Sequence, residues 1–98
     1  MDGKENAGGS YDAAQTGLLK LMLKLPSVRG RLQILAGHSL PLLELCEAYG
    51  EATETLEKLE RGLMIAQNGI LEEYRATCAE IEADVIELCL SNHFPRSK

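Results

Sequence analysis

The side chains of this sequence that could do chemistry are three cysteines, two histidines and several closely spaced carboxylates. Cys89 and His93 stand four residues apart, so a helix would present both on one face, as zinc ligands require. A structural zinc site takes four ligands, so Cys46 or Cys78 would have to join them, and the sequence has no CxxC pair. We therefore interpret the cysteines as small core residues and predict neither a metal site nor a cofactor.

Patterns typical of catalysis are weak. His38 and His93 lie beside expected helix ends, and neither has a nucleophile at a recognised spacing. Closely spaced acids such as Glu80 and Glu82 are typical of a solvated helix face. The sequence therefore predicts a protein that is not an enzyme, with no catalytic residue and no small-molecule substrate.

Two segments of the sequence can each be explained either by a function or by helix packing alone. Ile81, Val85, Leu88 and Leu90 have the spacing of a leucine-rich nuclear export signal, but helical periodicity alone explains the same residues. The segment "GLLKLMLKLPSVRGR", residues 17–31, combines an apolar stripe with four basic residues and could lie on an anionic membrane or in a groove. A helix that docks on acidic neighbours in the same molecule would have the same composition.

Composition favours one helical domain. The 98 residues are 45% apolar and 26% charged, with one Phe, no Trp and abundant leucine, which indicates an all-α protein. The net charge of −5 is concentrated in residues 40–90, so nucleic acid is disfavoured as a partner. An odd number of cysteines without an apolar leader segment suggests reduced thiols, and hence the cytoplasm or the nucleus.

Turn residues and periodicity predict the order of elements. We expect a flexible tail over 1–10, short helices within 11–36 interrupted at Pro26, long helical arms over 40–67 and 70–91, and a tail over 93–98. Residues 11–92 would form a single domain. Ser39 or Leu40 is expected near the cap of the first arm. Asn68-Gly69 is the strongest turn signal between the arms, and Gly62 offers a different turn position.

Along each arm, apolar residues recur at helical spacing and form a stripe on one side, which we call the seam. The spacing of the first seam does not continue in step into the second, and the change falls at Asn68-Gly69. Two helices in an antiparallel, coiled-coil-like hairpin accommodate this difference, because each helix sets its own register. One continuous helix with a skip stays open as the alternative. The small residues beside the first seam indicate a buried arc wider than that of a two-stranded coiled coil, as in a bundle of three or more helices.

From these patterns we expect a non-enzymatic interaction module, an adaptor or scaffold subunit of an intracellular complex that assembles through its apolar seam. Its partners would be proteins that pack as helices, with self-association left open, and membrane contact is the alternative, through residues 17–31. The predicted interaction residues share the seam or its flanks: Leu42, Leu45, Tyr49, Leu56, Leu59, Leu63, Leu71, Tyr74, Ile81, Val85, Ile86, Leu88 and Leu90.

Overall fold

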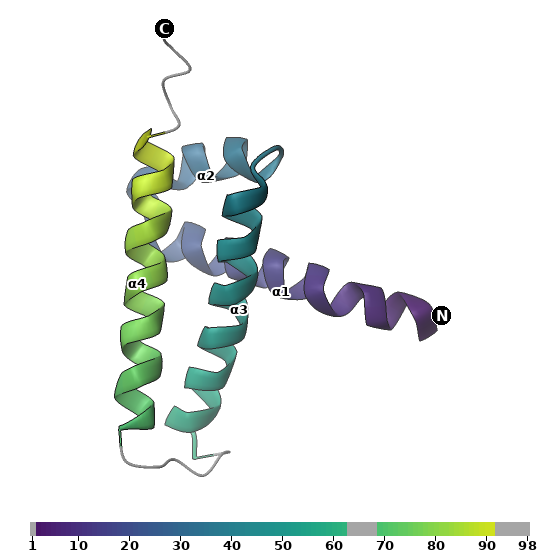
Figure 1. Cartoon of the computed structure of the whole chain (residues 1–98), viewed down its shortest axis with the longest axis vertical. Coiled ribbons are helices and arrows are strands. Elements are labelled where there is room, and N and C mark those ends of the chain that lie inside the picture. Colours follow the sequence, from purple (N-terminus) through teal and green to yellow (C-terminus); the bar gives the residue numbers. More distant parts are fainter. Residues whose placement is uncertain (1, 63–68, 92–98) are drawn as a thin grey trace, which may run out of the picture.

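A computed structural model describes the backbone of residues 2–62 and 69–91, and the side chains of residues 13–62 and 69–91. Its elements in chain order are α1 (Asp2–Lys24), a 3-10 turn η1 (Pro26–Val28), α2 (Arg29–Ala36), α3 (Leu40–Glu60) and α4 (Ile70–Ser91). These residues contain no strand, so the predicted all-α helical bundle is confirmed (Figure 1).

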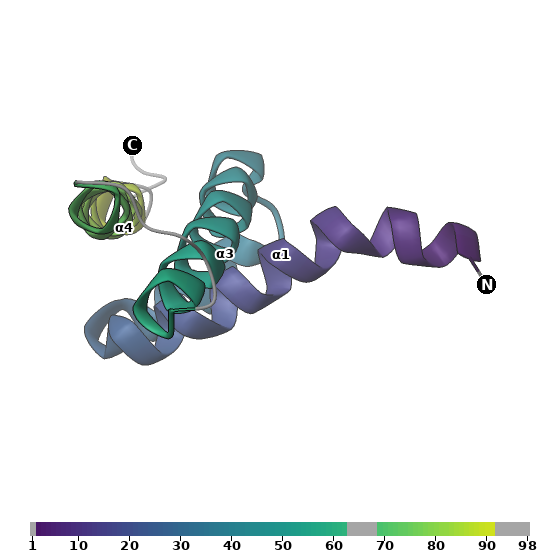
Figure 2. The ribbon, with the colours of Figure 1, turned by 90° about the horizontal axis from the view of Figure 1, so that it is seen from below.

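The helices form two layers. α3 and α4 lie side by side, and α1 and α2 lie across one face of this pair (Figures 1 and 2). α1 packs most extensively against α3, and its N-terminal half projects beyond the bundle. Because Tyr49 on α3 is hydrogen-bonded to Glu82 on α4, the two helices cannot be segments of one continuous rod.

Local chemistry explains several helix ends. Leu25 leaves the helical region, with φ −121° and ψ 67°, because Pro26 follows it. Ser39 is the N-cap of α3, and its Oγ accepts a 3.3 Å hydrogen bond from the backbone N–H of Leu42. After α3, Gly62 adopts φ +77°, a left-handed conformation that commonly follows the end of a helix.

Two predicted boundaries differ from the structure. The predicted flexible tail over 1–10 is replaced by helix, because α1 begins at Asp2 and is 23 residues long. Extending an existing helix needs no new nucleation, so the docked part of α1 can continue toward the N-terminus. The arm predicted over 40–67 ends at Glu60, where Gly62 interrupts it. Residues 63–67 and the predicted tail over 93–98 lie outside the described residues.

The core lies where α1 and α2 cross the α3/α4 pair. Val28 of η1 and Leu32 and Leu35 of α2 are buried in it. The fully buried side chains come from all four helices: Leu21, Leu32, Leu42, Cys46, Val85 and Cys89. None of the described residues in this core is charged, so apolar burial is its main source of stability.

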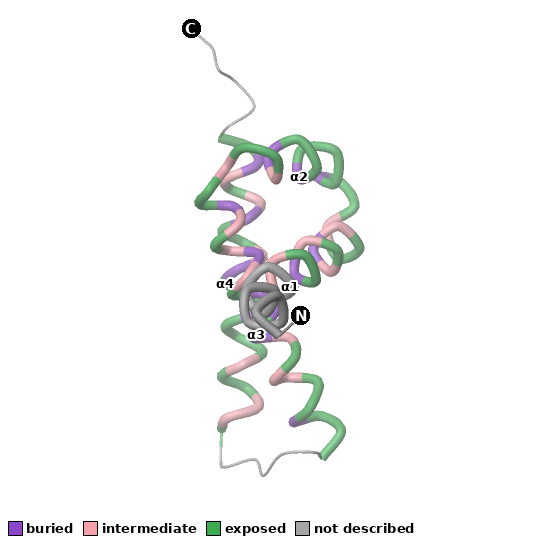
Figure 3. The backbone as a smooth tube through the Cα atoms, turned by 90° about the vertical axis from the view of Figure 1, so that its right-hand side faces the viewer, coloured by how far each residue is buried: buried purple, intermediate pink, exposed green. Residues whose placement is uncertain are grey.

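Burial falls along α3 and α4 with distance from α1 (Figure 3). In α3 beyond Thr53 only Leu59 is buried, and in α4 no residue before Cys78 is buried. α1 and α2 therefore cover only one end of the α3/α4 pair, and the other end has few buried side chains.

The contact between α1 and α3 depends on two glycines. A Cβ atom at Gly17 would overlap the carbonyl oxygen of Cys46 and lie 2.9 Å from the backbone nitrogen of Gly50. A Cβ atom at Gly50 would in turn overlap the carbonyl oxygen of Ala13. The helix backbones therefore touch at a point where any side chain would force them apart.

We expect Gly17→Ala and Gly50→Ala each to lower the free energy of unfolding by about 2–4 kcal/mol, since the new methyl meets backbone that cannot rotate away. Chemical denaturation followed by circular dichroism measures this change. Gly30→Ala is the matched control, because Gly30 lies in α2 with nothing within 4 Å of its Cβ position. The control should be unchanged or more stable, by up to about 1 kcal/mol. Equal midpoints for all three variants would contradict the close backbone contact.

Candidate interaction surface

The structure places the predicted interaction residues in different environments. The buried members are Leu42, Tyr49, Leu59, Ile81 and Val85. The half-buried members are Leu45, Leu56, Leu71, Tyr74, Ile86 and Leu88. Leu90 is 49% exposed, and Leu63 lies outside the described residues. Buried members cannot contact a partner while the bundle is closed, so much of the seam packs against the chain's own helices.

A polar contact joins three helices at Glu82. The Oη of Tyr49 donates a 2.6 Å hydrogen bond to Oε2 of Glu82, and Nζ of Lys24 lies 3.9 Å from the same oxygen. Burial and then the Glu82 carboxylate raise the pKa of Tyr49, so its hydroxyl remains a donor at neutral pH. The prediction that Glu82 belongs to a solvated face is wrong, because its side chain is only 19% exposed and links α1, α3 and α4.

Lys20 makes the second polar contact between α1 and the acidic helices. Its Nζ donates hydrogen bonds of 2.9 Å to Oγ1 of Thr53 and 3.1 Å to Oε2 of Glu57. Lys20 and Lys24, two of the basic residues in the segment 17–31, thus both pair with carboxylates of the same molecule. These contacts support the structural interpretation of that segment.

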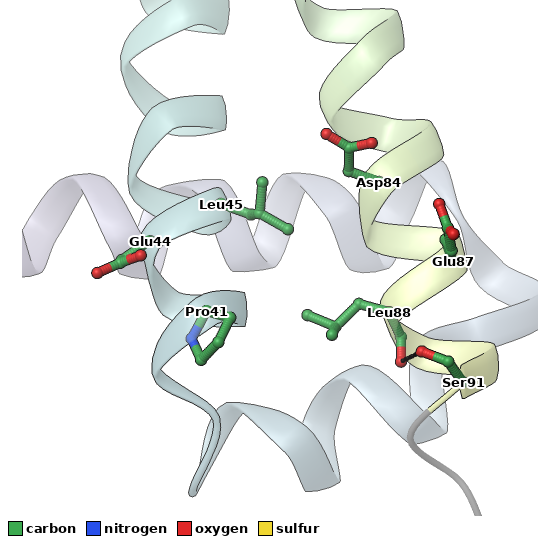
Figure 4. A pocket seen from close by; sticks show the side chains of 7 residues that line it. All are labelled: Pro41, Glu44, Leu45, Asp84, Glu87, Leu88 and Ser91. Atoms are coloured by element: carbon green, nitrogen blue, oxygen red, sulfur yellow. Dashed lines mark hydrogen bonds between the residues drawn. The ribbon is translucent and has the colours of Figure 1, made fainter.

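On the other face of the α3/α4 pair lies an open groove of about 530 Å³. Leu45 of α3 and Leu88 of α4 point toward each other across it (Figure 4). The groove is lined by Pro41, Glu44, Leu45, Asp84, Glu87, Leu88 and Ser91. Its centre is thus apolar, and its charged lining residues are all acidic.

The carboxylates of this groove differ from those elsewhere on the same helices. Within the described residues, Glu44, Asp84 and Glu87 form no ion pair and no side-chain hydrogen bond. Carboxylates that do form ion pairs include Glu57 with Lys20, Glu82 with Lys24, Glu54 with Lys58, and Glu60 with Arg75. The groove therefore carries negative charge that this part of the chain does not neutralise.

Large apolar side chains are also exposed away from the groove. Leu19 and Leu23 on α1 are 57% and 76% exposed. Leu19 is exposed because α1 packs through Gly17 and Leu21, and Leu19 lies about half a turn from both. Ile34 and Leu40 are exposed to a similar extent, 67% and 66%.

The cysteines do not form a reactive site. Cys46, Cys78 and Cys89 are free and buried. Burial, with a smaller contribution from Cys89, raises the pKa of Cys46 to about 11, so this thiol stays protonated at neutral pH and is a poor nucleophile. Within residues 13–62 and 69–91, no three His, Cys, Asp or Glu residues are grouped so that they could hold a metal ion, and His93 lies outside these ranges.

No helix among the described residues combines the length and hydropathy needed to cross a membrane. Comparisons with protein-family models, with curated proteins and with solved structures gave no match. The groove is therefore interpreted from its own geometry and chemistry.

Sequence reasoning identified Leu45 and Leu88 but missed the acids beside them. Glu44-Leu45 and Glu87-Leu88 repeat the same dipeptide on the two arms. The repeat becomes a signal only when the relative rotation of α3 and α4 is known, because that rotation decides whether the two dipeptides share one surface.

We expect Tyr49→Phe to lower the free energy of unfolding by about 1–2 kcal/mol, because it removes a hydrogen bond to a charged, half-buried carboxylate. Tyr74→Phe is the matched control, since Tyr74 packs partly buried against the core that contains Tyr49 but forms no hydrogen bond among the described residues. Thermal or urea denaturation measures both variants. A control as destabilised as Tyr49→Phe would show that the hydroxyl of Tyr49 has no special role.

Proposed function

We propose that this protein is a non-enzymatic helical interaction module, an adaptor or scaffold subunit of an intracellular multiprotein complex. The observation that carries the proposal is the open groove between α3 and α4, where Leu45 and Leu88 face each other at the surface. Accessible apolar surface of this kind on a small domain usually marks an interaction site.

We also propose that α3 and α4 are the arms of a long antiparallel hairpin. The contacts between Tyr49 and Glu82 and between Glu60 and Arg75 pair rising residue numbers on α3 with falling numbers on α4. A helix from a partner would then complete the bundle by lying along both arms. Free, buried thiols support the cytoplasm or the nucleus as the compartment.

Site-specific photocrosslinking tests the adaptor function. A photoreactive residue at Ser91, on the edge of the groove, should capture a distinct protein in a lysate of the source cells. The same residue at Glu72, exposed in the first turn of α4, should not capture it. The captured protein, purified and mixed with this chain, should form a complex of defined stoichiometry by light scattering. If nothing captured at Ser91 forms such a complex, the adaptor proposal is wrong.

A specific observation also favours the membrane alternative. Leu19 and Leu23 are exposed on α1, and the side chain of the neighbouring Lys24 is 61% exposed. Apolar and basic side chains on one helix are typical of a segment that binds anionic lipid.

Under this alternative, the chain should co-sediment with phosphatidylserine vesicles at low salt, and Leu19→Ser/Leu23→Ser should abolish binding. Ile34→Ser/Leu40→Ser is the control, because those side chains are exposed to a similar extent but lie outside α1. Absence of sedimentation, or equal loss in both variants, would eliminate a lipid site on α1.

A further inference from the structure

We infer that the groove between α3 and α4 binds an amphipathic helix of another protein that carries lysine or arginine. Its apolar side chains would lie between Leu45 and Leu88, and its basic side chains would contact the surrounding carboxylates. This inference rests on the proposed function as an interaction module and specifies the chemistry of the partner.

The two walls of the groove are built on similar patterns. In each wall a leucine points inward, and a carboxylate at the preceding residue lies outside it (Figure 4). The lining positions have helical spacing, so they share one face of each helix: Pro41, Glu44 and Leu45 on α3, and Asp84, Glu87, Leu88 and Ser91 on α4. The lining on α4 spans about two helical turns, which is enough to contact two or three successive apolar side chains of a docked helix.

The groove faces away from α1. Cys46 and Gly50 mark the side of α3 that α1 contacts. Glu44 is two residues from Cys46, about 200° around the helix, so it lies on the opposite side. Within the part of the chain that the structure describes, the α3/α4 pair therefore has one face that α1 covers and one face that is open.

The covered face shows which kind of helix this pair binds. α1 places Leu21 in the core, and its flanking Lys20 and Lys24 contact Glu57 and Glu82 of the pair. The α3/α4 pair thus already binds one helix of this kind, in which a leucine is buried and the lysines beside it pair with carboxylates. The open face offers the same combination of leucine and carboxylate, and among the described residues no lysine contacts its carboxylates.

Electrostatics discriminates among possible partners. A neutral or acidic helix in the groove would desolvate Glu44, Asp84 and Glu87 without providing a partner, and an unpaired carboxylate is costly to remove from water. Basic side chains at the edges of the helix would offset this cost and accelerate association. The charge of the groove therefore selects a basic amphipathic helix.

The probe that tests this inference is a fluorescent peptide of about 18 residues, with alanine as the host, leucines on one face and lysines on both flanks. Its binding to the full chain is followed by fluorescence anisotropy at low and high salt. We expect binding that weakens with salt and that Asp84→Asn/Glu87→Gln weakens about tenfold. Glu72→Gln/Glu73→Gln removes the same charge about 20 Å away along α4 and should change affinity less than about twofold.

Several results would overturn the inference. Equal weakening by both double variants would indicate unspecific charge attraction, provided that both variants keep the wild-type thermal melt. Equal binding of a peptide with glutamine in place of lysine would show that the groove does not select charge. No binding of either peptide would reject a helix of this chemistry. A dimer of this chain that Asp84→Asn/Glu87→Gln dissociates would identify a second copy as the occupant.

These failures are distinguishable from failure of the proposed function. Photocrosslinking at Ser91 detects a protein partner whatever its charge, so a captured and reconstituted partner would preserve the adaptor function even if the lysine peptide does not bind.

Discussion

The backbone contact between α1 and α3 at Gly17 and Gly50 determines how the rest of the bundle is arranged. With both positions at the smallest possible size, α1 can lie directly on α3. That position brings Lys20 within reach of Glu57, and Lys24 near Glu82 on the neighbouring helix. It also puts Leu21 among the side chains of the core. A wider separation of α1 and α3 would weaken all of these contacts together.

The same arrangement gives the α3/α4 pair two unequal faces. On the face toward α1, Lys20 pairs with the exposed Glu57 and Lys24 with the partly buried Glu82, and Tyr49 adds a hydrogen bond to Glu82. On the opposite face, Leu45 and Leu88 lie beside Glu44, Asp84 and Glu87, and among the described residues these three carboxylates form no ion pair and no side-chain hydrogen bond. Some of the chain's carboxylates therefore stabilise the position of α1, whereas those in the groove could pair with basic groups of a partner.

The sequence predicts helix ends that are determined by one residue nearby in the chain. Pro26 ends a helix and Ser39 caps one, because their effects act within a few residues. The role of Gly17 and Gly50 could not be predicted, since a glycine within a helix appears locally only as a loss of about 1 kcal/mol in propensity. Its benefit depends on a backbone 33 positions away. The partial burial of Glu82 was missed for the same reason, because it depends on which side of α4 the other helices cover.

The uneven burial along α3 and α4 has a consequence for recognition. The ends of these helices that lie far from α1 bury few apolar side chains, so they can open locally at lower cost than the ends held by α1 and α2. The groove lies at the held ends, near Leu42 and Val85, which are fully buried. Its two walls are thus preorganised, and a bound helix would lose little affinity to ordering them. Motion at the far ends can proceed without changing the distance between Leu45 and Leu88.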